Sequence, residues 1–132
     1  MHNHVKISLV FLLFIIAIST VYGQNDLLTT AERKGFLESS EAEKRTYYGR
    51  LAGKYRDQKK FDHAEKLGQY AYDYALQEED IEEANGVLLF LAKLMHLQAK
   101  YSKALEYCYK ILDSDLDLDQ KFKGKVYALK VM

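Results

Sequence analysis

Apolar and small residues recur at helical spacing along the chain from about residue 26 onward. Tyr48, Leu51, Ala52 and Tyr55 follow one another at steps of three, one and three positions, which places them along one face of an α-helix. Similar stripes continue towards the C-terminus. The chain contains no Pro, so the commonest helix breaker is absent. The pattern predicts an all-α protein.

Short polar links separate the predicted helices. We expect helices at about 30–37, 40–57, 62–77 and 81–98, a fifth capped by Ser102, and a last one after 113–119. Links such as 58–61 and 99–101 leave little chain between one helix and the next. Neighbouring helices are therefore expected to pack antiparallel.

Capping-box patterns mark three of these helix starts. In a capping box, a side-chain oxygen accepts from the backbone N–H three residues later, and the Glu at that position bonds back to the first residue. The pairs that fit this pattern are Thr29 with Glu32, Ser40 with Glu43, and Asp62 with Glu65.

The apolar pattern recurs at a constant offset along the chain. The first copy comprises Tyr48, Leu51, Ala52, Tyr55, Phe61, Ala64 and Ala71, and the second Leu88, Leu91, Ala92, Met95, Tyr101, Ala104 and Ile111. A third copy at the same offset starts with Ala128, Val131 and Met132. The repeating unit is a helix–turn–helix hairpin.

Small and aromatic residues have separate roles in this unit. An Ala on each helix allows the two helices to approach closely, and an aromatic residue at the turn is expected to plug the open end between them. The small residues are Ala52, Ala64, Ala92 and Ala104, and the aromatic residues at the turns are Phe61 and Tyr101.

This layout resembles the tetratricopeptide repeat, which has a large residue, a Leu–small pair and an aromatic on its first helix. Its second helix follows an aromatic at the turn and carries Ala. The matching residues are Tyr48, Leu51, Ala52, Tyr55, Phe61, Ala64 and Ala71, with Tyr101 and Ala104 in the second copy. The sequence departs from the family at Lys59 and Ala99, where a turn Gly is usual, and at Gly68, where an aromatic is usual.

The resemblance implies antiparallel helical hairpins stacked as a short tetratricopeptide-like α-solenoid. The repeats would lie at about 41–78, 81–116 and 118–132, the third being truncated. A generic antiparallel helical bundle is the alternative, because similar apolar stripes occur in many all-α proteins.

Residues 1–23 have the layout of a secretory signal peptide. Lys6 precedes an apolar run at 7–18, and Val21 and Gly23 suit a cleavage site before Gln24. The alternative is an uncleaved anchor, although the run is shorter than the roughly 18–20 residues that span a bilayer. The sequence predicts an exported protein, periplasmic or secreted.

A signal peptide before such repeats is similar to the exported N-terminal part of bacterial membrane regulators with tetratricopeptide repeats. Here residues 24–40 would form a lead-in with a short helix. The chain ends within the third repeat, which indicates a fragment or an end covered by a neighbour. The alternative function is therefore a periplasmic sensor segment of a membrane-bound two-component kinase or transcription regulator.

The sequence holds no catalytic or cofactor-binding motif. Its 19 basic and 19 acidic residues balance, which gives no electrostatic reason to expect nucleic-acid binding. His63 and His96 lie on separate predicted helices, and the Asp-rich segment 113–119 lacks the Gly and Glu of a calcium loop. Cys108, the only Cys, is predicted to be a buried packing residue. We expect no enzymatic activity, no cofactor and no metal.

Binding of a protein or peptide partner in a concave groove lined by first-helix residues is the favoured function. The residues predicted to contact the partner are those of the first helices that lie off the core stripe. They are Tyr47, Arg50, Lys54, Asn85 and Lys93.

The Tyr residues of the second helices bear on the same question. Tyr70 and Tyr74 share one helix face, and Tyr72 lies on another. Tyr107 and Tyr109 alternate similarly. Exposed Tyr is a common interface anchor, and helix packing is the alternative role.

Overall fold

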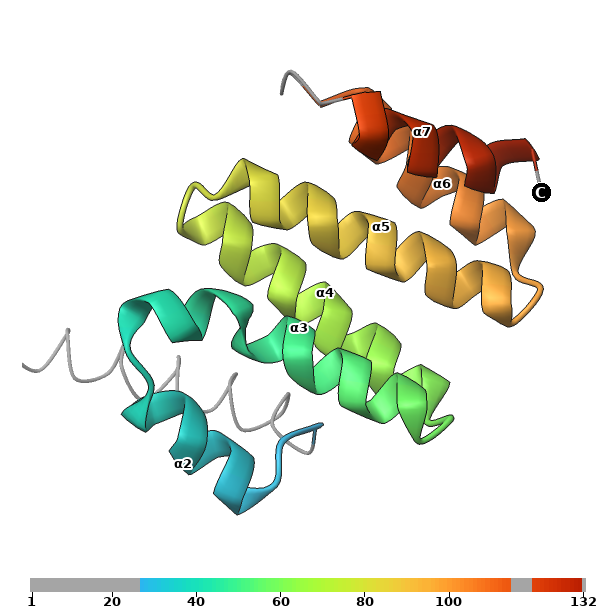
Figure 1. The fold of residues 1–132 in the computed structure, drawn as a ribbon. Helices are drawn as coiled ribbons and strands as arrows, with labels where there is room; N and C mark the ends of the chain where they lie inside the picture. Colours follow the sequence, from blue (N-terminus) through green and yellow to red (C-terminus); the bar gives the residue numbers. More distant parts are fainter. Residues whose placement is uncertain (1–26, 115–119, 132) are drawn as a thin grey trace, which may run out of the picture. The chain divides into compact units, whose positions relative to one another are not determined.

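The computed structural model describes residues 27–114 and 120–131, and in this part of the chain it is all-helical (Figure 1). The helices are α2 (Thr30–Glu38), α3 (Glu41–Asp57), α4 (Phe61–Gln77), α5 (Ile81–Leu97), α6 (Tyr101–Leu112) and α7 (Gln120–Val131). The predicted all-α class is confirmed. The predicted signal peptide at 1–23 and most of the Asp-rich link lie outside the described residues.

The chain divides into two compact units between residues 37 and 38. The described part of the first unit consists mainly of α2, which starts with the predicted capping box. The backbone N–H of Thr29 donates to Oε1 of Glu32 at 2.9 Å, and the N–H of Glu32 donates to Oγ1 of Thr29 at 3.1 Å. Both halves of this capping box are confirmed.

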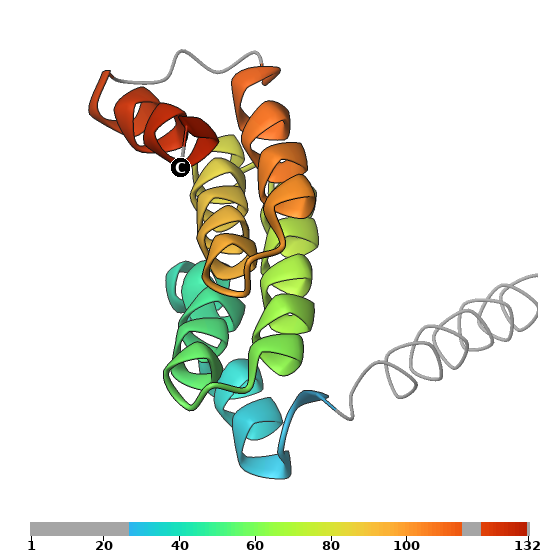
Figure 2. The ribbon, with the colours of Figure 1, turned by 90° about the vertical axis from the view of Figure 1, so that its right-hand side faces the viewer.

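The second unit is a stack of antiparallel helical hairpins. Each helix from α3 to α7 packs against the next one, and in addition α3 contacts α5 and α5 contacts α7. Figure 2 shows α3, α5 and α7 in one row and α4 and α6 in the other. A closed four-helix bundle would bring its first and fourth helices together, but α3 and α6 make no extensive contact among the described residues. The arrangement is therefore solenoid-like.

The helices of this unit begin at regular intervals, which are half as long as the repeat of the apolar pattern. They begin at positions 41, 61, 81 and 101, and α3, α4 and α5 each contain 17 residues. Short turns of equal length join them. The middle residue of each turn has a positive φ although none is Gly: Lys59 (61°), Glu79 (57°) and Ala99 (60°).

Each turn closes with the same backbone hydrogen bond. The N–H of the last turn residue reaches back five positions to the carbonyl of a buried residue, as in a Schellman motif. These bonds are Lys60 to Tyr55 at 2.9 Å, Asp80 to Ala75 at 2.8 Å, and Lys100 to Met95 at 2.9 Å. The repeated turn geometry explains the constant helix spacing.

Substituting Gly for Lys59, Glu79 or Ala99 is expected to stabilise the protein. The left-handed region costs a residue with a Cβ about 1–2 kcal/mol, and the larger entropy loss of Gly offsets part of this gain. We expect each substitution to raise the free energy of unfolding by about 0.5–1 kcal/mol, measured by urea denaturation.

The control for this prediction is Gln58→Gly. Gln58 has an ordinary φ of −84° in the same turn, so Gly offers no steric relief there and should destabilise the protein. Equal effects at positions 58 and 59 would contradict the explanation.

The predicted helix starts are only partly correct. Ser40 caps α3 by accepting from the N–H of Glu43 at 3.2 Å, as predicted. The predictions at Asp62 and Ser102 are wrong, because the N-cap residues of α4 and α6 are Lys60 and Lys100, two positions earlier, and form no side-chain cap. The closed turn fixes where these helices begin, so a good capping residue one or two positions later is not used.

The core confirms most of the repeat positions. The four small residues that were predicted to allow close helix approach are buried, namely Ala52, Ala64, Ala92 and Ala104. The plug predicted at Tyr101 is wrong, because this side chain is 53% exposed and instead makes an edge contact with His96 at a centroid distance of 5.2 Å. Phe61 is half-buried.

Helix α7 does not continue the repeat in the predicted register. Ala128 is exposed, whereas its counterpart Leu88 is buried. Val126 enters the core instead, in a cluster with Leu88, Cys108 and Ile111. The side chains of Val131 and Met132, the other two predicted positions, lie outside the description. Helix α7 begins at Gln120, so it does not keep the regular spacing of the helix starts at 41, 61, 81 and 101.

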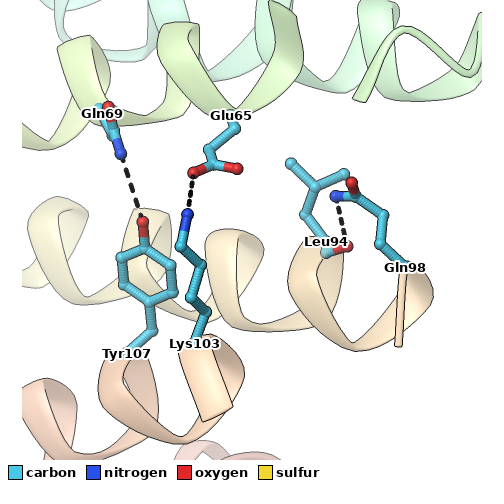
Figure 3. Close-up of polar contacts among 6 residues, drawn as sticks. All are labelled: Glu65, Gln69, Leu94, Gln98, Lys103 and Tyr107. Atoms are coloured by element: carbon cyan, nitrogen blue, oxygen red, sulfur yellow. Dashed lines mark hydrogen bonds and ion pairs between the residues drawn. The ribbon is translucent and has the colours of Figure 1, made fainter. Parts of the chain in front are cut away.

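Long side chains connect the second helices of the two hairpins. Figure 3 shows Nζ of Lys103 on α6 at 3.3 Å from Oε1 of Glu65 on α4, and Nε2 of Gln69 donating to the hydroxyl of Tyr107 at 3.4 Å. The hydrogen bond to Glu65 raises the pKa of Lys103. These exposed contacts link α4 and α6 but contribute little to stability.

Candidate functional site

A groove runs between α3 and α5, the first helices of the two hairpins. The groove contains a cavity of about 330 Å³ that is open to the surface. Helix α3 contributes Thr46, Gly49 and Arg50 to its lining, and α5 contributes Glu83, Gly86, Val87 and Phe90. We refer to these seven residues as the first-helix groove.

Two glycines in this groove leave space that no other described side chain fills. A Cβ added to Gly86 would meet nothing within 4 Å, and one added to Gly49 would meet only Oε1 of Glu83, at 3.9 Å. A Gly within a helix costs about 1 kcal/mol relative to Ala. Packing within the described residues does not require either Gly, and their effect is to keep the groove open.

The polar groups of the groove carry opposite charges. Arg50 on α3 stacks over the Tyr47 ring at 5.8 Å and forms no ion pair with any described residue. The carboxylate of Glu83 on α5 also lacks an ion pair within this part of the chain. Burial, followed by the neighbouring Asp80 and Glu82, raises the pKa of Glu83. Both groups are available to a bound partner.

An aromatic ring and a guanidinium lie together at one end of the groove. The guanidinium carbon of Arg56 on α3 lies 5.3 Å from the centroid of the Phe90 ring on α5. Arg56 is also ion-paired with Asp57 at 3.1 Å. This cation–π contact connects the two groove helices directly.

All five predicted contact residues lie on the two groove helices, but only Arg50 is among the residues that line the groove. Tyr47, Arg50 and Lys54 are spaced three and four positions apart, along one side of α3, and Arg50 lines the groove. Lys93 is exposed one turn beyond Phe90 on α5. Whether these residues contact a partner stays a prediction.

Asn85 lies on another side of α5, away from the groove. It was predicted to lie off the core stripe, and this is wrong because Asn85 is only 3% exposed. It lines a second cavity, of about 480 Å³, between α4, α5 and α6. The polar character of Asn85 predicts a surface position, and the sequence pattern does not distinguish these two sides of α5.

The Tyr residues form a packed cluster between α3 and α4. The Tyr48 ring centroid lies 6.2 Å from that of Tyr70 and 6.0 Å from that of Tyr74. Burial, followed by these neighbours, raises the pKa of Tyr48. The prediction that Tyr70 and Tyr74 share a face is confirmed, and Tyr72 packs against other core clusters.

The remaining reactive side chains do not form a site in the described residues. No group of three or more His, Cys, Asp or Glu is placed to hold a metal ion there. His63 stacks on Tyr55 at a centroid distance of 4.0 Å. Cys108 is buried, as predicted, and burial raises the pKa of its thiol more than nearby Lys130 lowers it.

Over residues 27–114 and 120–131, no helix combines the length and apolar character needed to cross a membrane. A scan against protein-family models gave no match, and searches of the curated proteins and of the solved structures gave none.

Sequence reasoning missed the residues that shape the groove. Gly49, Gly86, Glu83 and Phe90 were not predicted as site residues, although the two glycines are unfavourable in long helices. An unexplained Gly at the centre of a predicted first helix was the available signal.

Proposed function

We propose that this protein binds a segment of a protein or peptide partner in the first-helix groove. The observation that carries the proposal is the pair of mid-helix glycines, Gly49 and Gly86, which line an open groove from its two sides and are not needed for packing among the described residues. Helix stability alone would favour Ala at both positions. A partner whose backbone approaches α3 and α5 closely gives these glycines a role.

The charges of the groove indicate the chemistry of this partner. The guanidinium of Arg50, which has no ion pair in the described part of the chain, suits a carboxylate of the partner. Lys93 is a second exposed cation on α5, outside the residues that line the groove. Glu83 suits a hydrogen-bond donor or a cation. Val87 and Phe90 provide apolar contact beside them. The partner segment would therefore combine an apolar side chain with an acidic group.

The resemblance to tetratricopeptide repeats supports the same proposal, and with the predicted signal peptide it extends to binding outside the cytoplasm. Observing the processed N-terminus of the protein in the secreted or periplasmic fraction of its cells would support the second part. A protein that retains residues 1–23 in the cytoplasm would contradict export and leave the groove proposal open.

Filling the groove should strengthen the fold and weaken binding at the same time. Gly49→Ala and Gly86→Ala are each expected to raise the free energy of unfolding by about 1 kcal/mol through helix propensity. Each added methyl group should weaken binding about tenfold, which corresponds to about 1.4 kcal/mol. The binding measurement uses peptides selected by the wild-type protein from a random library on phage, followed by fluorescence anisotropy.

The matched control is Gly124→Ala on α7. A Cβ at Gly124 also meets nothing within 4 Å, but this residue lies outside the groove. It should stabilise the protein similarly and leave peptide binding unchanged. Equal binding by all three variants, or selection of no peptide by the wild type, would contradict the proposed function.

A further inference from the structure

The cavity between α4, α5 and α6 is separate from the first-helix groove and has the size of a small-molecule site. Its volume is about 480 Å³, within the usual range of about 300–1,000 Å³ for ligand pockets. Its apolar lining includes Tyr72 and Leu76 from α4 and Ile81 and Leu88 from α5. Its polar lining comes from the start of α5 and the end of α6.

Asn85 places a hydrogen-bond acceptor at the wall of this cavity. The hydroxyl of Ser114 donates to the carbonyl oxygen of Ile111 at 2.8 Å, so its oxygen must act as acceptor towards Asn85. Nδ2 of Asn85 donates to that oxygen at 3.1 Å, which fixes the orientation of the amide. Oδ1 of Asn85 receives no hydrogen bond from the described residues, although the residue is only 3% exposed. Oδ1 is not one of the buried side-chain atoms that lack a partner, so it is accessible at the cavity wall, where a ligand can supply a donor.

The cavity also carries one cation and one anion that are not paired with each other. Lys110 and Asp113 both line it from the end of α6, and neither forms an ion pair with another residue in the described part of the chain. Nζ of Lys110 lies 5.6 Å from the centroid of the Tyr72 ring, which is itself part of the cavity wall. The two charges therefore border one cavity and are available to a ligand with the complementary pair.

The cavity opening is apolar. Leu76 and Ile81 are 42% and 40% exposed, and both line the cavity. Leu88 lies deeper and is 2% exposed. A ligand that covers Leu76 and Ile81 would remove apolar surface from water, at about 25 cal/mol per Å².

We propose that this cavity binds a free α-amino acid with an apolar side chain. The ligand carboxylate pairs with Lys110, and the ligand ammonium donates to Oδ1 of Asn85 and pairs with Asp113. The ligand side chain contacts Leu76 and Ile81. This assignment gives a partner to each available group of the cavity lining: one cation, one anion, one acceptor and an apolar wall.

The test is isothermal titration calorimetry of the complete chain with three probes. L-Leucine carries both charges, N-acetyl-L-leucine lacks the ammonium group, and L-leucinamide lacks the carboxylate. We expect L-leucine to bind most tightly, and each modified probe to bind about tenfold or more weakly, because a charged hydrogen bond contributes substantially to affinity.

Variants of Lys110 and Asp113 test which charged group of the ligand each residue binds. Lys110→Met should weaken L-leucine and N-acetyl-L-leucine but leave L-leucinamide unaffected, and Asp113→Asn should weaken L-leucine and L-leucinamide but leave N-acetyl-L-leucine unaffected. The matched control is Lys66→Met, since Lys66 is an exposed cation of α4 that does not line the cavity. Unchanged helical circular dichroism verifies that each variant folds.

Several outcomes would overturn the proposal. One is the absence of binding by L-leucine. Another is equal binding of all three probes. A third is an equal effect of Lys66→Met and Lys110→Met. None of these results bears on peptide binding in the first-helix groove, so the two proposals fail independently.

Discussion

Replacing Leu91 by Ala is expected to lower the free energy of unfolding by about 3 kcal/mol, the typical cost of removing a buried Leu side chain. Leu91 is 1% exposed and packs with Ala71 and Val87 where α4 and α5 cross. The facing residue on α4 is Gly68, which has no side chain to move into the space. The cavity is therefore expected to remain, and urea denaturation followed by circular dichroism measures its cost.

A substitution at Gly68 tests whether this residue packs against the Leu91 side chain. A Cβ added to Gly68 would lie 2.6 Å from Cδ2 and 3.2 Å from Cγ of Leu91. Gly68→Ala alone is expected to destabilise by about 1 kcal/mol, because overpacking of about 1–3 kcal/mol outweighs the gain in helix propensity.

In the Leu91→Ala background the same methyl group fills part of the cavity. The double variant should therefore be more stable than the sum of the two single effects predicts, by about 1–2 kcal/mol. Additive effects would show that the two residues do not pack as the structure places them. Gly86→Ala in place of Gly68→Ala is the control, since a Cβ there meets nothing within 4 Å.

Replacing Ile111 by Ala is expected to cost a similar amount, about 3 kcal/mol, but with an effect that is confined to one end of the stack. Ile111 is fully buried in the cluster that joins α5, α6 and α7. In a solenoid each unit contacts only its neighbours, so local destabilisation spreads weakly. Hydrogen exchange followed by mass spectrometry should show faster exchange in α6 and α7 and unchanged protection in α3.

The pattern of hydrogen exchange distinguishes a solenoid from a closed helical bundle. A closed bundle has one shared core, and in that case Ile111→Ala would accelerate exchange in all helices equally. The matched control is Ala64→Gly in the other hairpin, because Ala64 is fully buried at the start of α4. Its effect should concentrate in α3 and α4.

The sequence was sufficient to predict the helices and most of the core. The spacing of Leu51, Ala52 and Tyr55, which recurs in the second hairpin, follows directly from which side of each helix is buried. Burial of apolar surface is the main driving force of folding, so this pattern is the most reliable signal that a sequence carries. The hairpin order followed from the short links.

Features that depend on backbone geometry were not predictable in the same way. Lys59, Glu79 and Ala99 adopt the left-handed conformation with no Gly to indicate it, and the turns they form moved two helix starts away from Asp62 and Ser102. The position of α7 depends on the rotation at which it enters the stack, and the apolar pattern does not determine this rotation. Both are tertiary effects that override local preference.

The sequence also predicted only part of the candidate site. Arg50 and Lys93 were identified because they are charged and lie off the apolar stripe. The groove itself arises from missing side chains at Gly49 and Gly86, and reasoning from chemically active residues gives little weight to a Gly. Asn85 is buried although Asn usually lies at the surface, because Ser114 accepts a hydrogen bond from its amide nitrogen.

Because the turns between the helices are equivalent, whole helices can be deleted from the chain at these turns. The turns at 58–60 and 98–100 form the same backbone hydrogen bonds before the next helix begins. An in-frame deletion of the segment 61–100 would therefore join α3 directly to α6 through an equivalent turn and yield one intact hairpin. Removing a single helix and its turn, such as the segment 61–80, would reverse the direction of every following helix. Viable changes in the length of this protein are thus expected in steps of two helices.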